Sequence, residues 1–174
     1  MKTHDVPNRN PSAPLHGDQL LPERREDTYR LRGKLPEPAW CPTCQLVYHK
    51  GKWQWLEKPE GAKAVTCPAC HRIHDRYPAG VLLLRGPRLP FLHDELIRQI
   101  RNVEQAESAE HPLRRIMAID DGDLWSWTVT TTDVHLARRL GEAIQRAHQG
   151  ELAIHYDGDE RSARVEWVSG DERG

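Results

Sequence analysis

The feature that most constrains this chain is a repeated cysteine motif. Cys41-Pro-Thr-Cys44 and Cys67-Pro-Ala-Cys70 contain all 4 cysteines of the 174-residue sequence. A Cys-x-x-Cys turn directs two sulfurs at one point, and two such turns brought together by a hairpin form a closed tetrahedral sulfur site. The spacing therefore predicts one structural zinc ion, bound by all four cysteines.

Other uses of these cysteines fit the sequence less well. The second pair with His71 matches the pattern for covalent haem attachment, but the N-terminal segment has neither an apolar core nor a small-residue cleavage site, so we expect a cytoplasmic protein. Disulfides are disfavoured in that compartment, and a redox dithiol would explain only one of the two pairs. Rubredoxin-type iron uses the same sulfur geometry and stays an alternative. His71 and His74 are spare ligands that a four-thiolate site does not need.

The residues between the cysteine pairs have the pattern of a zinc ribbon. Strand-forming residues flank a Lys50-Gly51 turn, and a longer loop leads to a return strand at residues 64–66. We therefore predict a ribbon over residues 40–78. Residues 1–39 hold 6 of the 13 prolines without a sustained hydrophobic period, which predicts a flexible tail.

The segment from residue 79 to residue 170 predicts an α/β domain, followed by a short tail at 171–174. Apolar runs bounded by Gly, Pro and Asp indicate strands, and two stretches with helical spacing alternate with them. The predicted strands are 80–86, 111–120, 124–130, 151–156 and 162–168, and the predicted helices are 91–109 and 133–148. The order βαββαββ predicts an α+β fold in which the ribbon is followed by a ferredoxin-like sandwich with one extra strand.

The second predicted helix has clear boundaries and a narrow apolar stripe. Asp133 is a good N-cap, and Gly150 lies just past the end. The residues expected to face the sheet are Val134, Ala137, Gly141 and Ile144.

Charge is distributed unevenly along the chain. Residues 40–90 hold 8 Lys/Arg against 3 Asp/Glu, whereas residues 91–174 hold 10 against 17. Cations interleaved with flat rings are typical of surfaces that bind single-stranded or looped RNA. The candidate RNA contacts are Lys50, Lys52, Trp53, Trp55, Arg72, Arg76, Tyr77, Arg85 and Arg88. The alternative is structural, with the two tryptophans covering the metal site and the two lysines in a solvated turn.

The run from the first CPxC through "YPAGVLLLRG" to "TTDVHLARRLGEAIQRAHQGEL" resembles an uncharacterised family of small bacterial zinc-ribbon proteins. More distantly, it is similar to the N-terminal part of the adaptor that exports the large ribosomal subunit in archaea and eukaryotes. The resemblance covers about residues 28–168. It implies a zinc-stabilised module that docks on ribosomal RNA or a ribosomal particle. The adaptor's further cysteine pairs, β-rich domains and export signals have no counterpart here, so export is not carried over.

Catalytic motifs give no support for an enzyme. The sequence has no G-x-x-x-x-G-K-[ST] phosphate loop, no G-x-S-x-G elbow and no H-E-x-x-H helix. It also has no apolar run long enough for a bilayer, so we expect no membrane partner. We therefore expect a non-catalytic RNA- or ribosome-binding factor. The alternative is a protein-interaction adaptor whose acidic domain binds a basic protein. Its acidic residues include Asp120, Asp121 and Asp123 in one turn. A metal-dependent enzyme is a third hypothesis.

Overall fold

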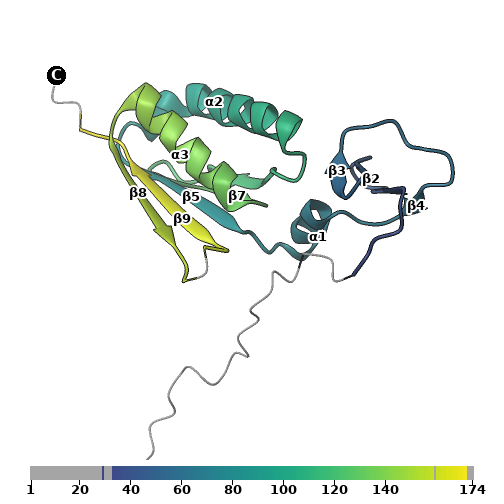
Figure 1. The fold of residues 1–174 in the computed structure, drawn as a ribbon. Helices are drawn as coiled ribbons and strands as arrows, with labels where there is room; N and C mark the ends of the chain where they lie inside the picture. Colours follow the sequence, from purple (N-terminus) through teal and green to yellow (C-terminus); the bar gives the residue numbers. More distant parts are fainter. Residues whose placement is uncertain (1–28, 30–32, 159, 172–174) are drawn as a thin grey trace, which may run out of the picture.

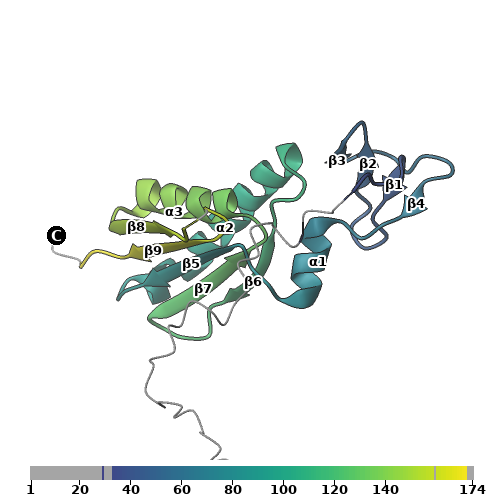
Figure 2. The same ribbon diagram turned by 60° about the horizontal axis from the view of Figure 1, so that its bottom comes forward.

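The protein is seen here in a computed structural model, which describes residues 29, 33–158 and 160–171. These residues form a mixed α/β structure with two sheets and three helices. Figures 1 and 2 show a small ribbon on one side, a larger α/β body on the other, and helix α1 between them. Most of the predicted tail 1–39 and residues 172–174 lie outside the described residues. None of the helices in the described ranges is long and apolar enough to cross a bilayer.

The ribbon is a four-stranded sheet with the strand order β3-β2-β1-β4. Its strands are β1 (Ala39–Trp40), β2 (Val47–His49), β3 (Lys52–Gln54) and β4 (Lys63–Ala64). The predicted β2–β3 hairpin is confirmed: Lys50 and Gly51 have φ angles of 52° and 78°, as a tight two-residue turn requires. Strand β1, which pairs with β2 and β4, is too short to leave a period in the sequence.

Helix α1 (Pro68–Asp75) begins inside the second cysteine motif. Cys67 is its N-cap, with Sγ accepting from the backbone N–H of Cys70 at 3.4 Å. Pro68 occupies the first helical position, where its missing N–H costs nothing. Arg76, with φ 52°, ends the helix. The sequence predicts no helix here, because eight residues are too few for a clear hydrophobic period.

The α/β body contains the predicted βαββαββ order. Its elements are β5 (Gly80–Arg85), α2 (Leu89–Glu110), β6 (Ile116–Asp120), β7 (Ser126–Thr131), α3 (Val134–His148), β8 (Glu151–Tyr156) and β9 (Ala163–Val168). The strand order in the sheet is β6-β7-β5-β9-β8 (Figure 2). Strand β9 pairs parallel with β5 and antiparallel with β8.

The extra strand lies inside the sheet. In a four-stranded ferredoxin-like sheet, the strand after the second helix pairs with the first strand. Here β9 holds that place, and β8 forms the edge. The inward residues Ala163, Val165 and Trp167 of β9 are buried, which suits a central strand, whereas β8 has no fully buried residue. The ferredoxin-like assignment therefore stays an interpretation of the element order.

Helices α2 and α3 cover one face of the sheet (Figure 1), and the core lies between the two layers. Helix α3 starts at Asp133, as predicted, with its carboxylate accepting from the N–H groups of His135 and Leu136. Ala137, Gly141 and Ile144 are buried as predicted, but the stripe is wider than expected. The fully buried Leu136 and Leu140 belong to it, and Val134 is only partly buried.

Gly141 permits the close approach of α3 to the sheet. A Cβ atom at this position would lie 2.5 Å from Cγ1 of Val165 and 3.0 Å from Cδ1 of Leu152. Replacing Gly141 with Leu should therefore lower the free energy of unfolding by about 1–3 kcal/mol or more through overpacking. Urea unfolding followed by circular dichroism measures this loss.

The matched control is Gln145→Leu, which adds the same side chain at an exposed position of the same helix. Its unfolding free energy should stay within about 0.5 kcal/mol of the wild-type value. Equal stability of the two variants would show that α3 does not approach the sheet through Gly141.

Candidate metal centre

The four cysteine sulfurs converge at one point of the ribbon. All four Sγ atoms lie within 4.8 Å of one another, and those of Cys44 and Cys67 are 3.6 Å apart. A tetrahedral ion with metal–sulfur bonds of about 2.3 Å requires sulfurs about 3.8 Å apart. The cluster therefore fits a tetrahedral metal ion, as the sequence predicted. The same geometry suits zinc and iron.

The first pair sits in a knuckle that follows β1. The backbone N–H of Cys41 donates to the carbonyl of Leu46, and that of Gln45 donates to the carbonyl of Cys41, both at 2.8 Å. Gln45 has a φ angle of 70°, which reverses the chain tightly. These contacts hold both sulfurs on the inner side of the turn.

The second pair uses the start of α1 for the same purpose. Cys67 and Cys70 lie at the N-cap and in the first turn of the helix, where the positive end of the helix dipole favours thiolates. His71 is exposed and does not belong to the sulfur cluster. His74 contacts the carboxylate of Asp75 at 3.1 Å instead.

The environments of the thiols differ. Burial raises the pKa of Cys67 despite the N–H donated by Cys70. Burial also acts to raise the pKa of Cys41. The backbone N–H groups of Cys67, Cys44 and Thr43 have the larger opposite effect, so the net pKa falls to about 6. Since metal ligation requires thiolates, metal binding displaces protons, and acid should release the metal.

The core of the ribbon is small and includes three of the sulfurs. Its buried residues are Cys41, Leu46, Trp53, Cys67, Ala69 and Cys70. The ring of Trp53 packs against Tyr48 with the centroids 5.4 Å apart. Trp53 therefore packs against the sulfur cluster. This placement agrees with the structural alternative, in which the residue covers the metal site.

Arg115 contacts this site from the α/β body. Its guanidinium lies 3.1 Å from Sγ of Cys44, 3.3 Å from Sγ of Cys70 and 3.7 Å from Sγ of Cys67. Burial lowers the pKa of Arg115, but the sulfurs of Cys44 and Cys67 raise it more strongly. Sequence reasoning missed this residue because Arg115 follows Cys70 by 45 positions and lies in the acidic half of the chain.

The predicted RNA contacts on the ribbon hairpin are mostly accessible. Lys50 and Lys52 are exposed, and the carboxylate of Glu37 accepts from the N–H groups of Lys50 and Gly51 at 3.2 and 3.1 Å. Trp55 is 48% exposed, while its Nε1 donates to the carbonyl of Ser108 at 2.8 Å. The hairpin therefore presents two cations and one flat ring.

The contacts predicted on α1 form a second group. Arg72 is buried, donates to the carbonyl of Tyr77 at 3.2 Å and lies 4.4 Å from the ring centroid of Tyr29. Tyr77 is 61% exposed and stacks on Tyr29, and Arg76 is exposed. Arg72 therefore organises the aromatic rings of this group, whereas Arg76 and Tyr77 are accessible.

Arg85 and Arg88 form a third group, which the structure separates from the ribbon. They lie at the far end of β5, about 17 Å from the end that follows α1. Arg88 donates to the carbonyl of His148 at 3.3 Å, so it ties α2 to α3. Arg85 is exposed at the end of its strand.

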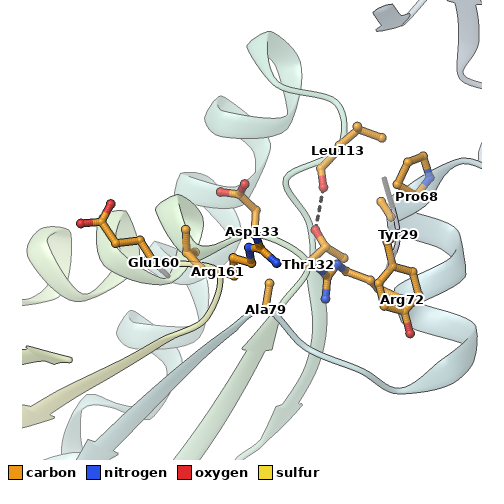
Figure 3. A pocket seen from close by; sticks show the side chains of 11 residues that line it. Tyr29, Pro68, Arg72, Ala79, Leu113, Thr132, Asp133, Glu160 and Arg161 are labelled. Atoms are coloured by element: carbon orange, nitrogen blue, oxygen red, sulfur yellow. Dashed lines mark hydrogen bonds between the residues drawn. The ribbon is translucent and has the colours of Figure 1, made fainter. Parts of the chain in front are cut away.

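A cavity of about 250 Å³ lies where α1 meets the body (Figure 3). Its lining includes Arg72 from α1, Thr132 and Asp133 from the segment before α3, and Arg161 from the β8–β9 turn. The Thr132 hydroxyl donates to the carbonyl of Leu113 at 2.6 Å, and Asp133 caps α3. Both contacts lie within the body, where they fix the loops that line one side of the cavity.

Removal of the metal should unfold the ribbon and spare the body. Metal binding contributes on the order of 10 kcal/mol to folding in modules of this type, and the α/β body has its own core. Elemental analysis should find one zinc or iron ion per chain. Chelation or acidification should then expose residues 40–78 to hydrogen exchange, while the strands and helices of the body outside the ribbon-docking segment 108–116 keep their protection.

Two substitutions test the ligand set. Cys44→Ser should reproduce the effect of chelation, while His71→Ala should keep the metal, because His71 lies outside the sulfur cluster. Loss of metal from His71→Ala, or its full retention by Cys44→Ser, would show that the ligands are assigned wrongly.

Comparisons of the chain with protein-family models, with curated proteins and with solved structures give no match. The resemblance to bacterial zinc-ribbon proteins and to the ribosomal export adaptor therefore stays a prediction. The geometry itself establishes a mixed α/β chain with a four-cysteine cluster suited to a metal ion.

Proposed function

We propose that the chain is a non-catalytic zinc-ribbon protein that binds RNA, with a ribosomal particle as its target. Zinc is the ion proposed for the four-cysteine site, and the ferredoxin-like interpretation of the body belongs to the same proposal. A site with four thiolate ligands leaves no open position for a substrate. The metal would therefore hold the ribbon in shape.

The observation that carries the RNA proposal is the surface of the β2–β3 hairpin. Lys50 and Lys52 are exposed at its turn, and the exposed ring of Trp55 follows its end. Phosphates bind such cations, and unpaired bases stack on such rings. The Glu37 carboxylate holds the backbone of the turn, so the two lysines are presented from a fixed loop. The ribosomal target rests on the resemblance alone.

Charge reversal of the hairpin tests the proposal. Lys50→Glu combined with Lys52→Glu should weaken binding to a single-stranded RNA at least tenfold in fluorescence anisotropy. The wild-type affinity should fall with salt, and the slope of log K against log salt should decrease by about 0.7 for each phosphate that the variant no longer neutralises. Both measurements use folded, metal-loaded protein.

The control reverses two exposed cations on α2, Arg98→Glu with Arg101→Glu, which changes the net charge equally. This variant should keep most of the wild-type affinity. Equal reductions of affinity in the two double variants would mean that net charge, rather than the hairpin, determines binding. A wild-type protein that binds neither RNA nor ribosomal particles would contradict the proposal.

A second candidate function is a protein-interaction adaptor. Phe91 is 86% exposed and Trp125 is 54% exposed, and both lie near the acidic turn 120–123. His93 joins the first turn of α2 to this turn through Nε2, 2.7 Å from Oδ2 of Asp121. Exposed apolar side chains beside carboxylates suit a basic protein segment with apolar anchors.

Neutralising the acidic turn separates the two candidates. Asp120→Asn with Asp121→Asn and Asp123→Asn should leave RNA binding intact or stronger, because repulsion of phosphates falls. It should weaken binding to a basic protein partner. Nuclease treatment of the native complex gives the second readout, since only an RNA-dependent complex would dissociate.

A further inference from the structure

Arg115 approaches three sulfurs of the metal cluster, although it belongs to the other part of the molecule. It precedes β6 in the α/β body, and its Nη1 and Nη2 atoms lie 3.3 Å from Cys70 Sγ and 3.1 Å from Cys44 Sγ. Nη2 is also 3.7 Å from Cys67 Sγ. A planar guanidinium presents several donors in a fixed arrangement, which allows one side chain to contact three sulfurs.

The body holds this guanidinium in position. The backbone N–H of Arg115 donates to Oγ1 of Thr132 at 2.9 Å, and its carbonyl accepts from the N–H of Thr132 at 2.9 Å. Its Nε donates to the carbonyl of Pro112 at 3.0 Å. Because the backbone and Nε are bound within the body, the two Nη groups are directed toward the ribbon.

The neighbouring contacts join the same two parts. Leu113 packs against the ribbon core, and Trp55 of the ribbon donates its indole N–H to Ser108 at the end of α2. The guanidinium carbon of Arg115 lies 5.8 Å from the ring centroid of Trp55. Arg115 therefore lies between the sulfur cluster and the ring that docks on α2.

We propose that Arg115 is an outer-shell residue of the metal site, so that metal binding and docking of the ribbon on the body are coupled. The inference rests on the metal site proposed above. Four thiolates and a divalent ion together carry two net negative charges. Hydrogen bonds from the Arg115 N–H groups to the sulfurs offset part of that charge. Without the metal, the four sulfurs are no longer held together as thiolates. The partly buried guanidinium then faces less negative charge, and this interaction between the ribbon and the body weakens.

The test measures zinc affinity by chelator competition in three variants of the full chain. Arg115→Met should bind zinc about 10- to 100-fold more weakly than the wild type, the usual effect of removing an outer-shell partner. Arg115→Lys should fall between them, because one ammonium group cannot match the two Nη contacts. The matched control is Arg114→Met.

Arg114 is the adjacent arginine, and its side chain is 20% exposed. It pairs with Glu107 at 2.9 Å and Asp133 at 3.3 Å. Arg114→Met should therefore lower the stability of the body and leave zinc affinity within about threefold of wild type. A purely structural role for Arg115 would give both methionine variants the same small effect on zinc affinity.

Docking has its own readout in hydrogen exchange at residues 108–116. Wild-type protein should lose protection there when zinc is removed, and zinc-loaded Arg115→Met should already show part of that loss. Wild-type zinc affinity in Arg115→Met would overturn the inference, as would unchanged protection in the zinc-free wild type.

The inference stays testable if Arg115→Met fails to fold. Arg115→Lys then takes its place, and wild-type zinc affinity in that variant would overturn the inference. A wild type that binds no metal would remove both the site and this inference. A wild type that binds metal but no RNA would end the proposed RNA function and leave the role of Arg115 standing.

Discussion

The convergence of four cysteine sulfurs is the constraint on which the ribbon depends. The ribbon core has six buried residues, and three of them are cysteines. A module of about 40 residues cannot bury enough apolar surface to be stable by itself and usually needs a metal or disulfides. The knuckle after β1 and the start of α1 therefore have to meet, and the small strands follow from that meeting.

The α/β body depends on a different force. Its two helices and five strands enclose a continuous apolar core with two buried tryptophans, Trp127 and Trp167, so burial of apolar surface is sufficient there. The two parts meet through a few specific contacts from Leu113, Arg115 and Trp55. Their relative position therefore depends on single side chains.

The arginines show how little residue type reveals about role. Arg72 is buried against aromatic rings, Arg88 ties α2 to α3, and Arg115 donates to sulfur. Exposed cations remain on the ribbon hairpin at Lys50 and Lys52. Within residues 40–90, Arg72 and Arg88 are therefore engaged in contacts inside the molecule, whereas the lysines of the ribbon, Arg76 and Arg85 stay exposed.

The sequence by itself determined what depends on local spacing: the clustering of the four cysteines, the Lys50-Gly51 turn, the Asp133 cap and the order βαββαββ. These features follow from periods and short motifs within one element or between neighbours. Tertiary structure alone decided the place of β9 inside the sheet, the packing of Leu136 and Leu140, and the contact of Arg115 with the sulfurs. Those depend on which surfaces meet across long sequence separations, where no spacing rule connects an arginine near β6 to a cysteine 71 positions earlier.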